Sequence, residues 1–538
     1  MLACTRIAVV GCLVFAFALG AIAWGSNAGG DGWESASESG VESADGLPNI
    51  VVVLVDDLGV MDISVPSLLD AQGRPVRHPL NDRYRTPHLE RLASQGVRFS
   101  QFYAMSVCSP SRIAWMTGQS SARHRTTNWI DPDGNNAGPH GPADWNWKGL
   151  DASDVTLARL LRDRGYRTIH IGKGHLGPRG SDGADPLRLG FDVNVGGASI
   201  GQPGSYFASK RYGADVGKGA YAVPGLDAYA EQGAFLTDAL TQVAMHHVGE
   251  AVREGKPFYL NLWHYAVHAP FQRDPRMVDR PQLDGLSADA KAFASLVEGV
   301  DQSLGQLLDH LETLGVAEET LVLFLGDNGS DAPLGGPHEV ACAAPLRGKK
   351  GSHYEGGMRV PMIASWAHAN ANHAMQLRLP IARGIVQPQR AAIYDWFPTL
   401  LELVGIEIPK GHAIDGRSLK TLLTGNPDPQ HTQPFLMHYP HAPHRSNHFT
   451  VYRDGDWKLI YHYFPSPDSS GTPVQLFDLG RDPYEQVDLA SSEEERERLD
   501  KLLEGMRMVL REQRALMPVD DAGDSLPLPI LKDAGAKK

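Results

Sequence analysis

Short runs of β-branched and apolar residues, each followed by polar residues, constrain the fold of this chain most. The clearest run spans 50–55 and reads Ile-Val-Val-Val-Leu-Val, with no polar side chain to face water. Such a run is typical of a strand that is buried on both faces of a sheet. Three further runs with this character occupy 168–171, 258–263 and 320–325.

Helical patterns separate these runs. Apolar residues at helical spacing predict helices over 87–95, 155–164 and 290–314, the first of them framed by Pro87 and Gly96. Helices that alternate with buried strands predict an α/β fold with a mostly parallel central sheet flanked by helices on both faces. The glycine-rich residues 178–230 show no clear periodicity, so we expect a loop there.

The chain changes character beyond residue 430. Short apolar runs broken by turn residues predict strands at 450–453, 457–461 and 474–478, and a helix is expected over 493–516. These elements indicate a smaller C-terminal antiparallel α+β domain. We expect the chain to divide into a signal peptide, a flexible linker, a catalytic domain, the α+β subdomain and a loose tail, at 1–25, 26–46, 47–430, 431–517 and 518–538.

The amino terminus has the pattern of a targeting segment. Arg6 precedes an apolar run over 7–24, and Ala21 and Ala23 offer a cleavage site for a signal peptidase. A membrane anchor is the alternative, because the run is near the lower length limit for spanning a bilayer. The signal-peptide interpretation predicts a secreted or periplasmic protein without stable membrane insertion after cleavage.

Polar residues follow each of the four buried strands. In a parallel sheet the carboxyl ends of the strands form one edge, and ligands bind beyond it. We therefore expect these side chains to meet there: Asp56 and Asp57, Lys173 and His175, His268, and Asp327 and Asn328. The oxygen ligands among them, from Asp56, Asp57, Asp327 and Asn328, suit Ca²⁺ or Mg²⁺ rather than Zn²⁺. A single acidic pair would instead indicate a helix cap or a turn.

Cysteine is scarce. Cleavage of the leader would leave only Cys108 and Cys342, which is too few for a disulfide framework. Cys108 begins the sequence C-x-P-S-R, which ends at Arg112 and continues into an apolar stretch that predicts a helix. A disulfide between Cys108 and Cys342 remains the alternative to a reactive Cys108.

Basic residues lie close to the acids in sequence. Lys173 and His175 are two positions apart, which places both side chains on one side of an extended segment. Lys350 lies in a glycine-rich loop whose backbone could approach an anion closely. Three other histidines are candidates by proximity alone: His264, His338 and His353. A group of tryptophans could stack on sugars or pack in the core: Trp129, Trp145 and Trp147.

These motifs together resemble type I sulfatases of the alkaline phosphatase superfamily. Besides C-x-P-S-R, the resemblance covers D-D-L-G at 56–59, G-K-x-H-L-G at 172–177, H-A-P at 268–270, G-D-N-G at 326–329, R-G-x-K-G at 347–351, E-G-G-x-R-V-P at 355–361, D-W-K-L-I at 456–460 and D-P-Y-E at 482–485. The family usually has a tryptophan where this chain has Gly174, a difference expected to open space near the site.

The resemblance implies roles for individual residues. An oxidase, the formylglycine-generating enzyme, would convert Cys108 to formylglycine (3-oxoalanine), which Arg112 would steady and His175 would contact. Ca²⁺, with Mg²⁺ as the alternative, would be held by the oxygen ligands and by residue 108. Lys173, His268 and Lys350 would hold the sulfate group. His268 is also expected to protonate the departing alcohol.

The sequence thus predicts an enzyme that hydrolyses sulfate monoesters, with a sulfated carbohydrate or a sulfated small molecule as substrate. The alternatives are an arylsulfatase of broad specificity, a phosphate or phosphonate monoester hydrolase on the same fold, and a glycan-binding protein without catalysis. The net charge of −13 argues against a nucleic acid as a partner.

Overall fold

The computed structural model describes residues 46–217, 221–441, 445–465 and 471–531. The predicted signal peptide, the predicted linker up to residue 45 and the last seven residues of the predicted tail lie outside the described residues. Among the described residues, no helix is both long and apolar enough to cross a membrane.

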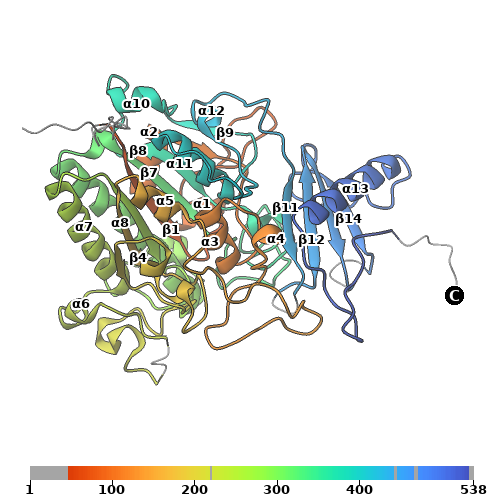
Figure 1. Cartoon of the computed structure of the whole chain (residues 1–538), viewed down its shortest axis with the longest axis horizontal. Coiled ribbons are helices and arrows are strands. Elements are labelled where there is room, and N and C mark those ends of the chain that lie inside the picture. Colours follow the sequence, from red (N-terminus) through yellow and green to blue (C-terminus); the bar gives the residue numbers. More distant parts are fainter. Residues whose placement is uncertain (1–45, 218–220, 442–444, 466–470, 532–538) are drawn as a thin grey trace, which may run out of the picture. The chain divides into compact units, whose positions relative to one another are not determined.

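The central sheet has eight strands in the order β5-β4-β6-β1-β7-β8-β2-β9 (Figure 1). Its strands are β1 (Asn49–Val55), β2 (Val97–Phe99), β4 (Arg167–Gly172), β5 (Val193–Val195), β6 (Phe258–His264), β7 (Thr320–Gly326), β8 (Met362–Trp366) and β9 (Ile385–Gln387). The five strands from β5 to β7 run parallel, whereas β8 is antiparallel to both of its neighbours. The predicted mostly parallel sheet is confirmed.

The described helices are α1 (Pro79–Arg83), α2 (Pro87–Gln95), α3 (Cys108–Thr117), α4 (Ser121–His124), α5 (Leu157–Asp163), α6 (Asp227–Glu231), α7 (Leu236–Arg253), α8 (Ala288–Thr313), α9 (Glu355–Met358), α10 (Ala374–Arg378), α11 (Trp396–Val404), α12 (Lys420–Leu423) and α13 (Arg496–Glu512). Alternate residues of β1 face two separate apolar cores, because successive side chains of a strand point to opposite faces. Val51, Val53 and Val55 pack with α2, α7 and α8, whereas Ile50, Val52 and Leu54 pack with α3, α5 and α11.

A second, four-stranded antiparallel sheet lies in the C-terminal part, in the order β11-β12-β13-β14 (Figure 1). Its strands are β11 (Phe435–Tyr439), β12 (Phe449–Asp454), β13 (Trp457–His462) and β14 (Val474–Asp478), and α13 packs on the sheet through residues such as Leu502 and Met506. A short pair, β3 (Phe102–Tyr103) and β10 (Ala391–Ala392), completes the strands of the described residues. The antiparallel sheet with its closing helix is confirmed.

Parallel register aligns the ends of the central strands. Val55 at the end of β1 pairs with His264 of β6 and with Gly326 of β7, and Gly172 of β4 pairs with Trp263 of β6. The residues that follow these four strands therefore emerge at the same level of the sheet. This alignment brings the predicted polar clusters together.

Candidate active site

Three aspartates form the acidic centre of the site. Asp56 and Asp57 follow β1 and Asp327 follows β7, and each offers a carboxylate oxygen that lies within 4.8 Å of the other two. All three are buried. The Asp57 backbone N–H donates to Asp327 Oδ1 over 3.1 Å, and the Asn328 side-chain amide donates to Asp57 Oδ1 over 2.9 Å. The four predicted oxygen ligands therefore do meet.

Several oxygens of this centre fit a hard cation. Asp56 Oδ1, Asp57 Oδ2 and Asn328 Oδ1 are buried without a hydrogen-bond partner among the described residues. Buried polar atoms are almost always satisfied, so unpaired oxygens that lie together indicate a ligand. Carboxylate and amide oxygens are the donors preferred by Ca²⁺ and Mg²⁺. The residues present fit such an ion.

Three buried cations balance the three acids. Lys173 Nζ lies 2.6 Å from Asp56 Oδ2, and Lys350 Nζ lies 2.6 Å from Asp57 Oδ1. Arg112 lies 2.8 Å from Asp327 Oδ2 and donates from Nη1 to the Lys173 carbonyl over 3.0 Å. The formal charges of these side chains sum to zero, so a bound divalent cation would leave the cluster positive and able to attract an anion.

The surroundings shift the aspartate pKa values in different directions. Burial raises the pKa of Asp56 to about 7 and that of Asp327 to about 6. Burial acts on Asp57 as well, but the Lys350 ammonium and His268 outweigh it and hold the pKa of Asp57 well below its usual range. Asp57 is therefore the carboxylate of the three that its neighbours keep most firmly ionised.

Cys108 occupies the first position of α3, with its side chain 3% exposed. Its Sγ lies 3.3 Å from Nδ1 of His175, and His175 Nε2 lies 2.7 Å from the carbonyl oxygen of Ile130. Burial lowers the pKa of His175 well below its usual value. The amino-terminal end of a helix carries a partial positive charge, which favours negative charge that develops on residue 108.

The disulfide alternative is wrong in this structure. Cys108 and Cys342 are both free and buried. The Cys342 thiol donates instead to the carbonyl oxygens of Ala332 and Leu334, over 3.1 and 2.7 Å. Cys108 is thus available as a site residue.

His268 completes the set of predicted residues. Its Nε2 lies 3.5 Å from Asp57 Oδ2, and its Nδ1 lies 2.8 Å from the Ala269 carbonyl oxygen. Burial lowers the pKa of His268 to about 4, whereas Asp57 acts in the opposite direction. Because the Ala269 carbonyl oxygen accepts a hydrogen bond, the contact favours the neutral tautomer with the proton on Nδ1.

Two expectations about 172–175 need correction. Lys173 and His175 both reach the site, but the segment is not extended, because Gly172 (φ 101°) and His175 (φ 58°) both have positive φ. Gly174 does not open space beside the site. A Cβ on Gly174 would lie 2.9 Å from the Ala198 carbonyl oxygen, so the backbone of another loop fills this position.

The chain matches two known protein families. Residues 48–406 match the family described as Sulfatase, and residues 349–513 match the one described as N-sulphoglucosamine sulphohydrolase, C-terminal. The chain belongs to the sulfatase family. It is a sulfuric ester hydrolase, as the sequence predicts.

Named relatives of the sulfatase act on different esters. Human N-acetylgalactosamine-6-sulfatase is 31% identical over 509 residues, covering 89% of this chain and 88% of the relative. Mouse steryl-sulfatase is 29% identical over 569 residues, covering 88% and 83%. The crystal structure of Ps i-CgsB shares the fold, with a TM-score of 0.68, 24% identity, and coverage of 87% of this chain and 93% of that one. The alkaline-phosphatase-like fold is confirmed.

A cavity of about 360 Å³ opens above Cys108 in the sulfatase. Of the predicted site residues, His175, His268 and Lys350 line it together with Cys108. Residues that sequence reasoning did not predict as part of the site line the rest, namely Pro132, Gly201, Gln202, Tyr221, Ala269, Asp331 and Arg445. Of these, Asp331 could have been found, since it lies four residues beyond Asp327. Trp129 also lines the cavity, whereas Trp145 is buried in the core.

The three histidines named by proximity lie outside this cavity of the sulfatase. His264 Nε2 lies 3.0 Å from Ser303 Oγ, and His338 Nδ1 lies 3.2 Å from Ser352 Oγ. His353 Nδ1 lies 2.7 Å from Ser446 Oγ, and this contact joins the loop that contains Lys350 to the connection between β11 and β12. Their contacts are structural.

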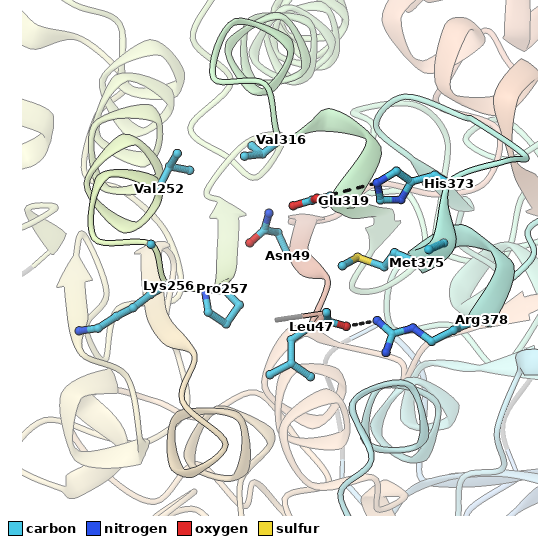
Figure 2. A pocket seen from close by; sticks show the side chains of 13 residues that line it. Leu47, Asn49, Val252, Lys256, Pro257, Val316, Glu319, His373, Met375 and Arg378 are labelled. Atoms are coloured by element: carbon cyan, nitrogen blue, oxygen red, sulfur yellow. Dashed lines mark hydrogen bonds and ion pairs between the residues drawn. The ribbon is translucent and has the colours of Figure 1, made fainter. Parts of the chain in front are cut away.

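A larger cavity, with a volume of about 710 Å³, lies elsewhere in the sulfatase. Figure 2 shows the side chains that line it. Asn49, Pro257 and Glu319 line it, close to where β1, β6 and β7 begin. The predicted site residues lie beyond the opposite ends of the same strands. The smaller cavity above Cys108 is therefore the candidate active site of the sulfatase.

Proposed function

We propose that this sulfatase hydrolyses the sulfate monoester of a sulfated carbohydrate through a formylglycine formed from Cys108. The observation that carries the proposal is the 3.3 Å contact between Cys108 Sγ and His175 Nδ1 beside the three buried aspartates. Hydrated, the aldehyde would supply two geminal hydroxyls, one as the nucleophile for sulfur and one whose deprotonation expels sulfate.

We assign the metal site to Asp56, Asp57, Asp327 and Asn328, together with residue 108 once it is modified. The unpaired, buried oxygens of Asp56, Asp57 and Asn328 support Ca²⁺, with Mg²⁺ as the alternative. The ion would act as a Lewis acid toward the nucleophile and the sulfuryl oxygens.

The basic side chains would bind and orient the substrate. Lys350 lines the cavity, and Lys173 lies beside Asp56 of the acidic centre. Their ammonium groups would hold sulfuryl oxygens and stabilise charge in the transition state. Arg112 would hold Asp327 and the loop of Lys173 in position, since it bonds to both.

The two histidines would move protons at opposite ends of the reaction. His268 Nε2 would protonate the departing alcohol, and His175 Nδ1 would take the proton of the second hydroxyl. At pH 7 the first role requires a higher pKa for His268 than the value near 4 that burial imposes. The negative charge of a bound sulfate ester acts in that direction.

The proposal includes maturation of Cys108 and export of the protein. The formylglycine-generating enzyme would act on Cys108, and the predicted signal peptide would direct the chain to the periplasm or the exterior. Detection of the protein in the extracytoplasmic fraction, with its amino terminus near residue 25, tests this part. An intact leader on a cytoplasmic protein would contradict it.

The chemical proposal is tested by rates on matched esters. Purified enzyme should release sulfate from a sulfated monosaccharide and from 4-nitrophenyl sulfate with higher kcat/KM than phosphate from 4-nitrophenyl phosphate or its phosphonate analogue. A preference for the phosphorus esters would favour the phosphate or phosphonate monoester hydrolase instead. Release from nitrophenyl sulfate alone would favour the broad arylsulfatase.

A further inference from the structure

The lining of the cavity above Cys108 includes a polar ion pair that the proposed hydrolytic chemistry does not use. Arg445 Nη2 lies 2.7 Å from Asp331 Oδ2, and Arg445 Nη1 contacts Asp331 Oδ1 as well. Both residues line the cavity that holds Cys108 and Lys350. Asp331 is 9% exposed, and Lys349 Nζ lies 3.4 Å from its Oδ1.

The position of the pair is fixed from both sides. The Asp331 backbone N–H donates to the Asp57 carbonyl over 3.2 Å, which ties it to a residue of the acidic centre. Arg445 belongs to the connection between β11 and β12. The next residue, Ser446, contacts His353 Nδ1 at 2.7 Å. The C-terminal part of the chain therefore contributes a side chain to the cavity at a defined place.

The pairing of Arg445 decides which kind of group it can recognise. An arginine without an acidic partner would favour a second anionic group on the substrate. Here the Asp331 carboxylate compensates the charge of Arg445, and Lys349, the other cation beside Asp331, does not line the cavity. The pair therefore presents hydrogen-bond donors and acceptors to the cavity without a net charge of its own. Hydroxyl groups, which donate and accept, match this combination.

An aromatic side chain lies in the same cavity. Trp129 is partly buried and lines the cavity together with Cys108, Asp331 and Arg445. The face of an indole ring packs well against the apolar C–H face of another ring. The Asp331–Arg445 ion pair beside the face of Trp129 is therefore suited to a ring that carries hydroxyl groups. A purely apolar ring fits poorly, because it would bury the ion pair without giving it hydrogen bonds.

We propose that Asp331, Arg445 and Trp129 form the binding site for the leaving group, and that this group is an uncharged sugar ring. The inference rests on the proposed function, because it names the alcohol that the hydrolysis releases. Asp331 and Arg445 bind ring hydroxyls, and Trp129 packs on the ring. The sulfate group itself stays with Lys173, His268 and Lys350.

The test compares three substrates of the full-length enzyme: a sulfate ester of an uncharged monosaccharide, a steroid sulfate and 4-nitrophenyl sulfate. Arg445→Gln and Asp331→Asn should each lower kcat/KM for the sugar sulfate by about 10–100-fold, as expected for a lost hydrogen bond to a charged group. Trp129→Leu should act in the same direction. The losses for nitrophenyl sulfate, which has no ring hydroxyls, should be at least about tenfold smaller.

The chain offers a matched control. Arg211 and Asp227 form an Arg–Asp pair outside the cavity, with side chains 56% and 72% exposed. Arg211→Gln should change none of the three rates. Thermal unfolding shows whether each variant is folded, and Arg445→Gln carries the test if Asp331→Asn is destabilised, since the Asp331 carboxylate then keeps its contact with Lys349.

Equal losses on the sugar and nitrophenyl esters would overturn the proposal. A wild-type enzyme that hydrolyses nitrophenyl or steroid sulfate but no uncharged sugar sulfate would overturn this leaving-group site and leave the sulfatase mechanism standing. An enzyme that releases sulfate from none of the three esters would overturn the proposed function, and this inference with it.

Discussion

Arg112 Nε donates a hydrogen bond to Asp327 Oδ2 over 2.9 Å, with both side chains fully buried. The bond joins α3, which carries Cys108, to the end of β7. A cation–π contact with Trp263, 5.2 Å from the guanidinium carbon to the ring centroid, holds the other side of Arg112.

Loss of Arg112 should destabilise the protein as well as inactivate it. Arg112→Met leaves the Asp327 carboxylate buried without its strongest partner, a change that typically costs about 3–5 kcal/mol. The midpoint of thermal unfolding should fall. The double variant Arg112→Met/Asp327→Asn removes both charges and should regain part of the midpoint without regaining activity. Arg496→Met, in an exposed pair with Asp500, is the control. An unchanged midpoint in Arg112→Met would show that the pair is unimportant for stability.

Removal of the metal should abolish turnover. Chelation removes the positive charge that the nucleophile and the sulfuryl oxygens share, and added Ca²⁺ or Mg²⁺ should restore the rate whereas Zn²⁺ should not. Asp56→Asn should weaken Ca²⁺ binding, as measured by calorimetry. The loss should exceed the about 10–100-fold that is typical of removing a residue that only hydrogen-bonds to a metal ligand. The exposed Asp227→Asn is the control. An enzyme that depends on Zn²⁺ and ignores Ca²⁺ would contradict the oxygen-ligand argument.

His268 should matter most for poor leaving groups. A sugar alkoxide needs a proton in the transition state, whereas a nitrophenolate leaves with little help. General acid catalysis typically contributes about 10²–10⁴-fold, so His268→Ala should lose on that order in kcat/KM against a sugar sulfate and much less against nitrophenyl sulfate. Similar losses on the two esters would make His268 a sulfate-binding residue only.

A buried ionic cluster that does not line the cavity above Cys108 should control acid stability. Lys458 Nζ lies 3.0 Å from Glu355 Oε1 and 2.6 Å from Glu485 Oε1. Burial acts to raise the pKa of both carboxyls and does so for Glu485, but Lys458 and Arg453 outweigh it at Glu355 and lower that pKa to about 2.

A lowered pKa in the folded state stabilises the fold above the unfolded value, and this contribution is lost as the pH falls. The stabilisation from Glu355 should therefore disappear between about pH 4.5, the ordinary value, and pH 2. Lys458→Met should lower the midpoint of thermal unfolding at pH 7. Between about pH 4.5 and pH 2, the midpoint of this variant should fall less steeply than that of the wild type. Arg481→Met, with a side chain 88% exposed, should do neither. An unchanged pH dependence in Lys458→Met would contradict the assignment.

The parts of the fold that the sequence predicts best are those with a local signal. The apolar run of β1 and the Pro87 start of α2 mark their elements within a residue, because burial and helix capping act on neighbouring positions. The edge strand β5 (Val193–Val195) fell within the predicted loop 178–230, since three half-buried residues carry no clear pattern. Helix α7 has a helical apolar pattern that should have predicted it, with Leu236, Leu240 and Val243 on its buried face.

Some residues of the candidate site could be predicted from the sequence, and others could not. The meeting of Asp56, Lys173 and Asp327 follows from one rule about parallel strands, because the register aligns the strand ends. Arg445 could not be placed from sequence, since its position depends on how the β11–β12 connection packs against a distant loop through Ser446 and His353.

The state of residue 108 in active enzyme tests the central claim most directly. Mass spectrometry of the peptide that contains residue 108, from a preparation of measured sulfatase activity, should show the thiol replaced by an aldehyde, with sulfur exchanged for oxygen and two hydrogens lost. The fraction of aldehyde should rise in proportion to the specific activity across preparations. Full activity with an intact Cys108 thiol would contradict the account.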